Sequence, residues 1–185
     1  MGDAEPVCIG DEVPYELPRG WAWSRLVNLC CPQERPTFPS GYFKYIDIDS
    51  IDNEKSCVRE PKSVALKDAP SCANRKIRSG LTLFSMVRPY LRKIALIDES
   101  LSDSIASTRF YAASTISGEV LSLRLFLMLG SDSFVNTANS FMKGGNSPSI
   151  RKDEMDAMSI PIPPAREAER IITLASSMLR ALRGL

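Results

Sequence analysis

The sequence predicts an α+β fold, with short strands and two helices followed by a terminal helix of coiled-coil type. Short runs that alternate bulky and polar residues, bounded by Pro, Gly and Asp, are typical of strands. The apolar stretch 119–130 is long enough for a buried helix and ends at a glycine. Residues 165–183 contain neither Pro nor Gly and follow several prolines, which favours a helix that begins after them.

The N-terminal part divides at about residue 16. Residues 1–16 carry five acidic and no basic residues, which predicts a poorly ordered acidic leader with a net charge of −5. An ordered domain is expected from residue 17, where a Pro-Gly turn precedes Trp21 and Trp23, two rings that we expect in the core. We therefore divide the chain into a leader (1–16), a main domain (17–164) and a terminal helix (165–185).

Strands are expected within the first part of this main domain. The candidates are 42–49, the two runs 81–88 and 94–97, and the stretch 105–113. Two acidic clusters lie beside them, namely Asp47, Asp49 and Asp52, and Asp98, Glu99 and Asp103. The first lacks the glycine and glutamate of an EF-hand loop, and we interpret both as turns rather than as metal ligands or catalytic carboxylates.

The second part of the domain is expected to be helical, then extended. Helices are predicted at 119–130 and at 131–142, the latter capped by Ser131 or Asp132. A glycine-rich loop follows at 143–148, a turn lies within 150–158, and prolines force residues 159–164 to be extended.

The terminal helix has the charge order that suits its dipole, with glutamates near its start and arginines near its end. Apolar residues recur in it at heptad spacing, which predicts a dimerisation seam. The seam consists of Ile171, Ala175, Met178, Leu182 and Leu185. A helix about 28 Å long is marginal alone, so it must pack on its own domain or on a partner helix.

The composition excludes several classes of enzyme. The chain has 185 residues, a net charge of +1 and no histidine, so it contains no Ser-His-Asp or Cys-His pair and no His ligand for zinc. Phosphate-binding and dinucleotide-binding glycine motifs are absent, and we predict no catalytic residue, cofactor or metal. Five cysteines without a C-x-x-C pair or a signal peptide predict reduced thiols in a cytoplasmic protein, and no stretch reaches the length of a membrane span. The adjacent Cys30 and Cys31 are expected to be buried apolar residues, although a redox or metal role is the alternative.

One segment has a strong local charge. Residues 71–93 hold six basic and no acidic residues, a local charge of +6 in a nearly neutral chain. Such a segment suits a nucleic acid, whose phosphates bind Lys and Arg, although a solvated strand surface is the alternative. With the nearby glycine-rich loop, the candidate DNA-binding residues are Arg75, Lys76, Arg78, Arg88, Arg92, Lys93, Lys143 and Asn146.

Several motifs, in order along residues 17–171, resemble the specificity subunit of type I restriction-modification enzymes. The first motif is Leu-Pro-Arg-Gly-Trp-Ala-Trp at residues 17–23, and Ala-Pro-Ser, Val-Arg-Pro and Ala-Ser-Thr-x-Phe follow later in the chain. The last motif is Ile-Pro-Ile-Pro-Pro at residues 160–164, followed by Glu167 and Ile171 at the family's spacing. Family members usually carry two target-recognition domains and two long helices, whereas this chain has one domain and one short helix.

The resemblance implies a binding role without catalysis. A target-recognition domain reads one half of a bipartite site in double-stranded DNA, and the helices dock the methyltransferase and restriction subunits, which carry out the chemistry. Self-association through the terminal helix would give a dimer that reads an inverted repeat. Two alternatives stay open: a protein-interaction module, such as a decoy or inhibitor of a restriction system, and a small enzyme that uses the carboxylates or Cys30 and Cys31.

Overall fold

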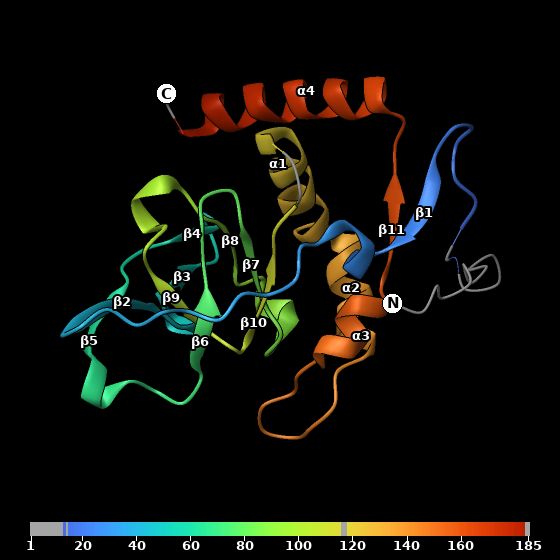
Figure 1. Cartoon of the computed structure of the whole chain (residues 1–185). Helices are drawn as coiled ribbons and strands as arrows, with labels where there is room; N and C mark the ends of the chain where they lie inside the picture. Colours follow the sequence, from blue (N-terminus) through green and yellow to red (C-terminus); the bar gives the residue numbers. More distant parts are fainter. Residues whose placement is uncertain (1–12, 14, 116–117, 184–185) are drawn as a thin grey trace, which may run out of the picture.

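The computed structural model describes residue 13, residues 15–115 and residues 118–183, without the side chains of 118–120 and 179–183. The α+β class is confirmed: short strands form the sheets on one side, and helices cover them (Figure 1). The predicted leader falls mostly outside the described residues, but Tyr15 is described and packs edge-on against Trp23, with ring centroids 5.0 Å apart.

Two sheets form the strand part of the domain. A four-stranded sheet has the order β5-β2-β9-β6, and a three-stranded antiparallel sheet has the order β10-β7-β8. Strands β3 and β4 form a separate two-stranded ribbon. Their bounds are β2 Tyr42–Ile46, β3 Ile51–Asp52, β4 Cys57–Val58, β5 Lys62–Ala65, β6 Ala73–Lys76, β7 Thr82–Ser85, β8 Ile94–Leu96, β9 Ile105–Ser107 and β10 Phe110–Ala113.

The single strand predicted at 105–113 is wrong, because this segment forms β9 and β10, which belong to different sheets. The chain changes sheet at Thr108, whose N–H donates to the carbonyl of Cys72 at 2.7 Å. At Arg109 the N–H donates to the hydroxyl of Ser107 and the carbonyl accepts from Met86. Every residue of both strands is buried, so polar alternation could not reveal the break.

The two ends of the main domain meet in one antiparallel pair. Strand β1 (Ala22–Arg25) pairs with β11 (Ser159–Ile162), which places Trp23 opposite Pro161. Both tryptophans are half-buried at the surface, so their expected core position is wrong.

The turn predicted within 150–158 is a short helix, α3 (Lys152–Ala157), stabilised by a hydrogen bond from the N–H of Arg151 to Glu154 at 2.8 Å.

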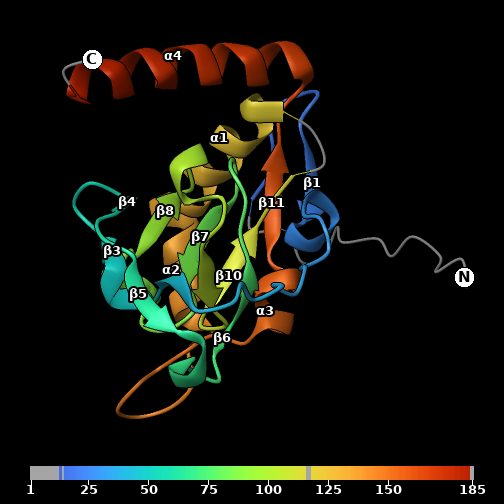
Figure 2. The same cartoon turned by 60° about the vertical axis from the view of Figure 1, so that its left-hand side comes forward.

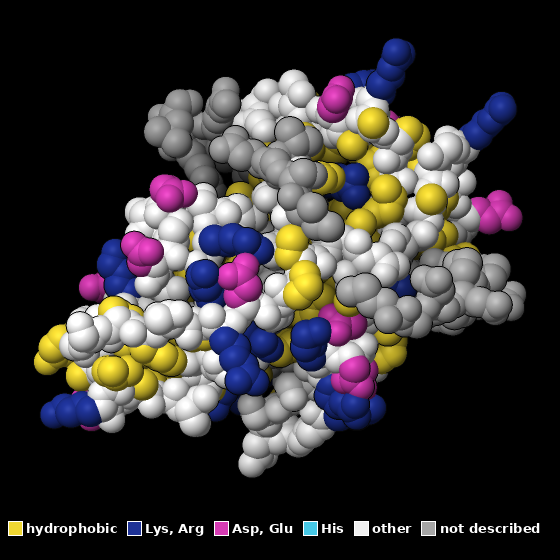
Figure 3. Space-filling view, in the orientation of Figure 1, with side chains coloured by type: hydrophobic (Ala, Val, Ile, Leu, Met, Phe, Trp, Pro, Cys, Tyr) yellow, Lys and Arg dark blue, Asp and Glu magenta, His cyan; other side chains and the backbone are white. Residues whose placement is uncertain are grey.

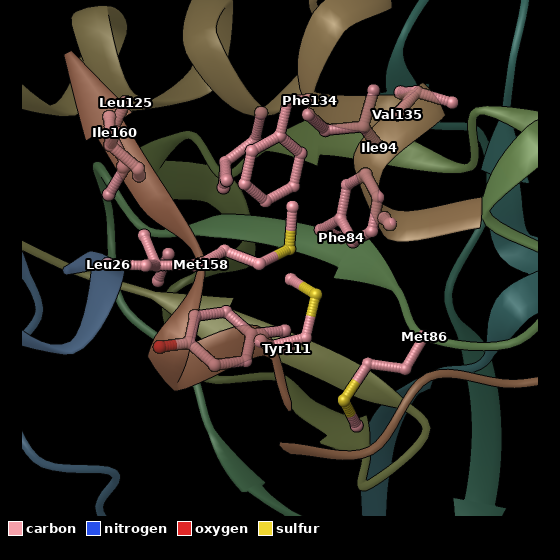
Figure 4. Packing of buried hydrophobic residues seen from close by; sticks show 14 of the residues in the cluster. Leu26, Phe84, Met86, Ile94, Tyr111, Leu125, Phe134, Val135, Met158 and Ile160 are labelled. Atoms are coloured by element: carbon pink, nitrogen blue, oxygen red, sulfur yellow. The ribbon is translucent and has the colours of Figure 1, made fainter. Parts of the chain in front are cut away.

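The predicted central helices are confirmed as α1 (Gly118–Leu129) and α2 (Asp132–Ser140), the latter capped by Ser131. They cover the three-stranded sheet and enclose the largest hydrophobic cluster. In Figure 4, Phe84 of β7 lies beside Phe134 of α2, and their ring centroids are 5.4 Å apart. Met158 lies between this pair and Leu26, so residues from both ends of the domain share this core.

The terminal helix α4 (Ala165–Arg183) begins where the prolines predict. Figures 1 and 2 both show it lying across the end of α1, and in Figure 1 its C-terminal half lies above the strand part of the domain. Ala168 and Ile172 are the buried residues of its described face, and the indole N–H of Trp21 donates to Glu167 at 2.9 Å. Helix α4 is therefore held to the domain near its start.

The acidic clusters form turns, as predicted. Asp47 accepts a hydrogen bond from the N–H of Ser50 at 3.1 Å, and Asp98 accepts one from the N–H of Ser100 at 2.9 Å. Asp52 accepts the N–H groups of Glu54 and Lys55. Each carboxylate thus satisfies local backbone donors.

Candidate nucleic-acid interface

The basic segment 71–93 runs through both main sheets and does not form one continuous surface. It contains β6, the buried strand β7, a one-turn 3-10 helix at Pro89–Leu91 and the turn before β8. Figure 3 shows Lys and Arg side chains interspersed with Asp and Glu over the lower front of the molecule. The basic side chains therefore have to be considered in local groups.

The first group surrounds Glu34, in the loop before β2. Its carboxylate lies 3.0 Å from Nζ of Lys76 and 3.2 Å from a guanidinium nitrogen of Arg78. All three side chains are about half exposed, and the two cations hold the pKa of Glu34 below its usual value. Lys76 and Arg78 thus lie together, but Glu34, which is 42 residues from Lys76 in sequence, partly neutralises both.

Arg75 lies between these surface residues and the core. A register shift in the pairing of β6 with β9 falls between Ala73 and Arg75. Its side chain is half-buried, its Nε atom is buried without a hydrogen-bond partner, and burial lowers the pKa of the guanidinium. This residue is less accessible to a phosphate than its two neighbours.

The second group joins Arg88 to the glycine-rich loop. The guanidinium of Arg88 donates to the carbonyl of Asn146 at 2.7 Å, and backbone bridges connect Val87 and Lys143 to Ser149. Lys143 lies 2.8 Å from Glu154 of α3 and remains largely exposed. The structure therefore brings Arg88, Lys143 and Asn146 together at one exposed loop.

The remaining two cations act as internal ties. Arg92 donates to the carbonyl of Gly130 at 2.9 Å and pairs with Asp132, which connects the 3-10 turn to the start of α2. Lys93 donates to the carbonyl of Ile51 at 2.6 Å, which connects β8 to the β3–β4 ribbon. Both contacts stabilise the fold and leave less of each charge available to a ligand.

The predicted dimerisation seam is partly exposed on α4. Ile171 is 37% exposed and Met178 is 58% exposed, whereas Ala175 is half-buried. Leu174, which the heptad assignment missed, is 60% exposed and lies on the same side as Ile171 and Met178. The side chains of Leu182 and Leu185 lie outside the described part of the chain. We call the Ile171, Leu174 and Met178 surface the α4 stripe.

Other chemistry has little support in the described ranges. Across residue 13, 15–115 and 118–183, no group of three or more His, Cys, Asp or Glu is arranged to hold a metal ion. Cys30 packs against the main core, and burial raises the pKa of its thiol to about 11, although a hydrogen bond with Tyr111 opposes this shift. Its thiolate form is therefore scarce at neutral pH, and both Cys30 and Cys31 are half-buried rather than fully buried as expected. In the same described ranges, no helix is long and apolar enough to cross a membrane.

Sequence reasoning missed one basic side chain, Arg124 of α1. It is only 8% exposed and lies in a helix whose other residues are mostly apolar, so the local charge pattern gives no signal for it. Sequence reasoning also missed the acids that pair with the candidate basic residues, because Glu34, Asp132 and Glu154 lie outside the segment 71–93.

Comparison with known proteins gives one consistent result. No family model matches the chain. A curated relative, the type I restriction enzyme HindI specificity subunit of Haemophilus influenzae, is 28% identical over 138 residues, which are 72% of this chain and 29% of that protein. The HsdS subunit of Thermoanaerobacter tengcongensis matches 92% of this chain and 45% of its own, with 35% identity and a TM-score of 0.77.

Two further solved structures share the fold. A chain from a study of complex assembly in a type I restriction-modification system has 36% identity and a TM-score of 0.80 over 92% of this chain and 45% of its own. The S subunit from M. genitalium has 14% identity and a TM-score of 0.55, which shows the fold alone. The chain spans about half the length of these structural relatives and 29% of the curated relative. The resemblance seen in the sequence is confirmed: the chain is similar, in sequence and in fold, to one half of a type I restriction-modification specificity subunit.

Proposed function

We propose that this chain reads one half of a bipartite site in double-stranded DNA for a type I restriction-modification system. The observation that carries the proposal is the match of 92% of the chain, at 36% identity and a TM-score of 0.80, to half of a chain from such a system. Because the match covers half of that chain, the chain corresponds to one recognition domain with its helix. One recognition domain suits one half-site.

The proposed DNA contacts are the candidate basic residues, which differ in how accessible they are to DNA. Lys76 and Arg78 at the Glu34 group and Arg88, Lys143 and Asn146 at the glycine-rich loop are exposed, and we propose that they meet phosphates or base edges. Arg92 and Lys93 keep a smaller share of the contact, because their nitrogen atoms already bind backbone carbonyls. The half-buried Arg75 supports the surface from below.

The proposed assembly uses the α4 stripe. A helix with Leu174 and Met178 more than half exposed leaves apolar area that a partner helix would cover. We propose that the seam residues Ile171, Ala175, Met178, Leu182 and Leu185, extended by Leu174, pair with a second copy. The resulting dimer docks methyltransferase and restriction subunits, which carry out methylation and cleavage of DNA in the cytoplasm, while this chain contributes no catalytic group.

A selection from randomised duplex DNA tests the proposal. The chain, mixed with the methyltransferase subunit of the same system, should enrich one short sequence, and the enriched set should vanish when the chain is omitted. Enrichment of no sequence, together with tight binding to the methyltransferase, would contradict DNA reading and favour the decoy or inhibitor alternative.

A further inference from the structure

The turn between β9 and β10 lies between the two exposed groups of candidate DNA contacts. It consists of Thr108 and Arg109. The N–H of Thr108 donates to the carbonyl of Cys72, directly before β6, at 2.7 Å, and the carbonyl of Arg109 accepts the N–H of Met86 at 2.9 Å. Strand β6 carries part of the Glu34 group, and Met86 also accepts a hydrogen bond from the chain just after the glycine-rich loop. Figures 1 and 2 both place β6 and the orange loop before α3 toward the lower end of the domain, opposite α4.

Arg109 is an exposed cation on a fixed backbone. Its N–H donates to the hydroxyl of Ser107 at 3.2 Å, and the residues on either side of the turn, Ser107 and Phe110, are 1% and 0% exposed. Within the described part of the chain, its guanidinium has no ion pair and no hydrogen bond. The cations of the Glu34 group, in contrast, already contact a carboxylate. The donors of Arg109 are therefore available to a ligand, and the backbone that carries them needs no further ordering.

Asn74 is a second exposed polar side chain at the same place. The pairing of β6 with β9 shifts register between Ala73 and Arg75, so no residue of β9 lies opposite Asn74. Such an irregularity turns a side chain out of the regular alternation of a strand. Among the described residues, the exposed amide of Asn74 has no hydrogen-bond partner. Because the adjacent Ala73 pairs with Ser107, two residues before Arg109, the two free side chains begin close together.

The guanidinium of Arg109 lies on the side of the turn that faces β6. Burial raises the pKa of the Cys72 thiol, but hydrogen bonds with Tyr45 and Ser107 and the positive charge of Arg109 lower it, and the lowering is larger. The charge of Arg109 is therefore near Cys72, which is two residues from Asn74 in sequence.

We propose that Arg109 and Asn74 read bases in the major groove, Arg109 a guanine and Asn74 an adenine of the same half-site. The inference rests on the proposed function, because it names two side chains that determine the specificity of DNA reading. A guanidinium can donate to both O6 and N7 of guanine, and an asparagine amide can pair with N6 and N7 of adenine. The cations on either side would hold phosphates, which position the DNA but carry no sequence information.

Three variants test this inference: Arg109→Met, Arg109→Lys and Asn74→Ala. Affinity is measured by fluorescence anisotropy, with the methyltransferase present, for the selected duplex and for a scrambled one. Arg109→Met and Asn74→Ala should each lose at least about tenfold in affinity for the selected duplex and much less for the scrambled one. Arg109→Lys keeps the charge but not the planar pair of donors, so it should bind the scrambled duplex like the parent and still discriminate poorly.

Modified bases identify which base each side chain reads. A guanine analogue in which carbon replaces N7 is placed at each guanine of the half-site in turn. One position should weaken binding by the parent chain and have no effect on binding by Arg109→Met. The corresponding adenine analogue should give the same result with Asn74→Ala.

The matched control is Arg170→Met, at an exposed arginine of α4, which lies at the opposite end of the domain from β6 in Figures 1 and 2. This variant should discriminate between the two duplexes like the parent and respond to both modified bases in the same way.

The results that would overturn the inference differ from those that would overturn the proposed function. If the parent enriches a sequence, and Arg109→Met and Asn74→Ala bind that sequence like the parent, the two side chains do not read bases and the proposed function stands. Equal losses of affinity for the selected and the scrambled duplex would show contacts to phosphates alone and would also refute base reading. Failure of the parent chain to enrich any sequence would remove both this inference and the proposed function.

Discussion

Glu34 lies between two of the proposed DNA contacts, so removing its charge should strengthen DNA binding. Its carboxylate lies 3.0 Å from Lys76 and 3.2 Å from Arg78, and these cations hold its pKa below the usual range. Glu34 is therefore ionised at neutral pH and competes with a phosphate for both side chains. The substitution Glu34→Gln keeps the size of the side chain and removes this competition.

The opposite change, the double substitution Lys76→Ala and Arg78→Ala, should weaken DNA binding. The size of this effect follows from the number of phosphate contacts that are lost. If each cation meets one phosphate, the slope of log K against log salt becomes shallower by about 1.8, since each contact contributes about 0.9. When the salt rises from 50 to 200 mM, the double variant should therefore lose about twelvefold less affinity for DNA than the parent chain loses. Exposed ion pairs contribute little to stability, so both variants should remain folded.

Fluorescence anisotropy of a labelled duplex that contains the selected sequence measures both effects across a salt series, with the methyltransferase present. Glu34→Gln should bind more tightly than the parent, with the difference largest at low salt, and Glu60→Gln, at an exposed acid, is the control. If Glu34→Gln binds no better and the double alanine variant keeps the parental slope, Lys76 and Arg78 do not face DNA.

Three further predictions concern stability and assembly. Leu129→Ala should lower the free energy of unfolding by about 2–5 kcal/mol in urea titrations, because this side chain is fully buried in the main core; a loss below 1 kcal/mol would contradict that packing. The backbone N–H of Lys55 and the guanidinium of Arg59 hold the pKa of Asp52 below its usual value. Because the pKa of Asp52 is lower in the folded than in the unfolded chain, its carboxylate stabilises the fold above about pH 4, and this stabilisation is lost as the solution becomes more acidic. The melting temperature of Asp52→Asn should therefore depend less on pH below about pH 4 than that of the parent chain. Leu174→Asp should abolish self-association in sedimentation experiments, and an unchanged dimer would exclude the α4 stripe as its interface.

The sequence predicted the helices whose ends are set by neighbouring residues in the chain. The prolines at 161, 163 and 164 set the start of α4, and Gly130 with Ser131 separates α1 from α2. The break between β9 and β10 could not be predicted, because every residue of both strands is buried and the change of sheet depends on the distant Cys72 carbonyl. Local sequence carries no information about such a partner.

In the candidate site, too, the sequence predicted what depends on neighbouring residues and missed what depends on residues far away in the chain. The candidate basic residues were found from the local charge and the nearby glycine-rich loop, but their acidic partners come from other parts of the chain and reduce the charge available to a ligand. On α4, both the inward side with Ile172 and the outward side with Leu174 carry apolar residues. Periodicity alone could not tell which side faces the domain, so the predicted heptad seam combined the half-buried Ala175 with the exposed Ile171 and Met178.

The most direct test of DNA reading is the methylation pattern of a host genome. The chain is expressed there with the methyltransferase subunit of its own system, and the methylated sites are sequenced. One new bipartite motif is expected, and its two halves should form an inverted repeat, because two identical recognition domains read it. A methylome that is the same with and without the chain would contradict the proposal that this chain selects the DNA site.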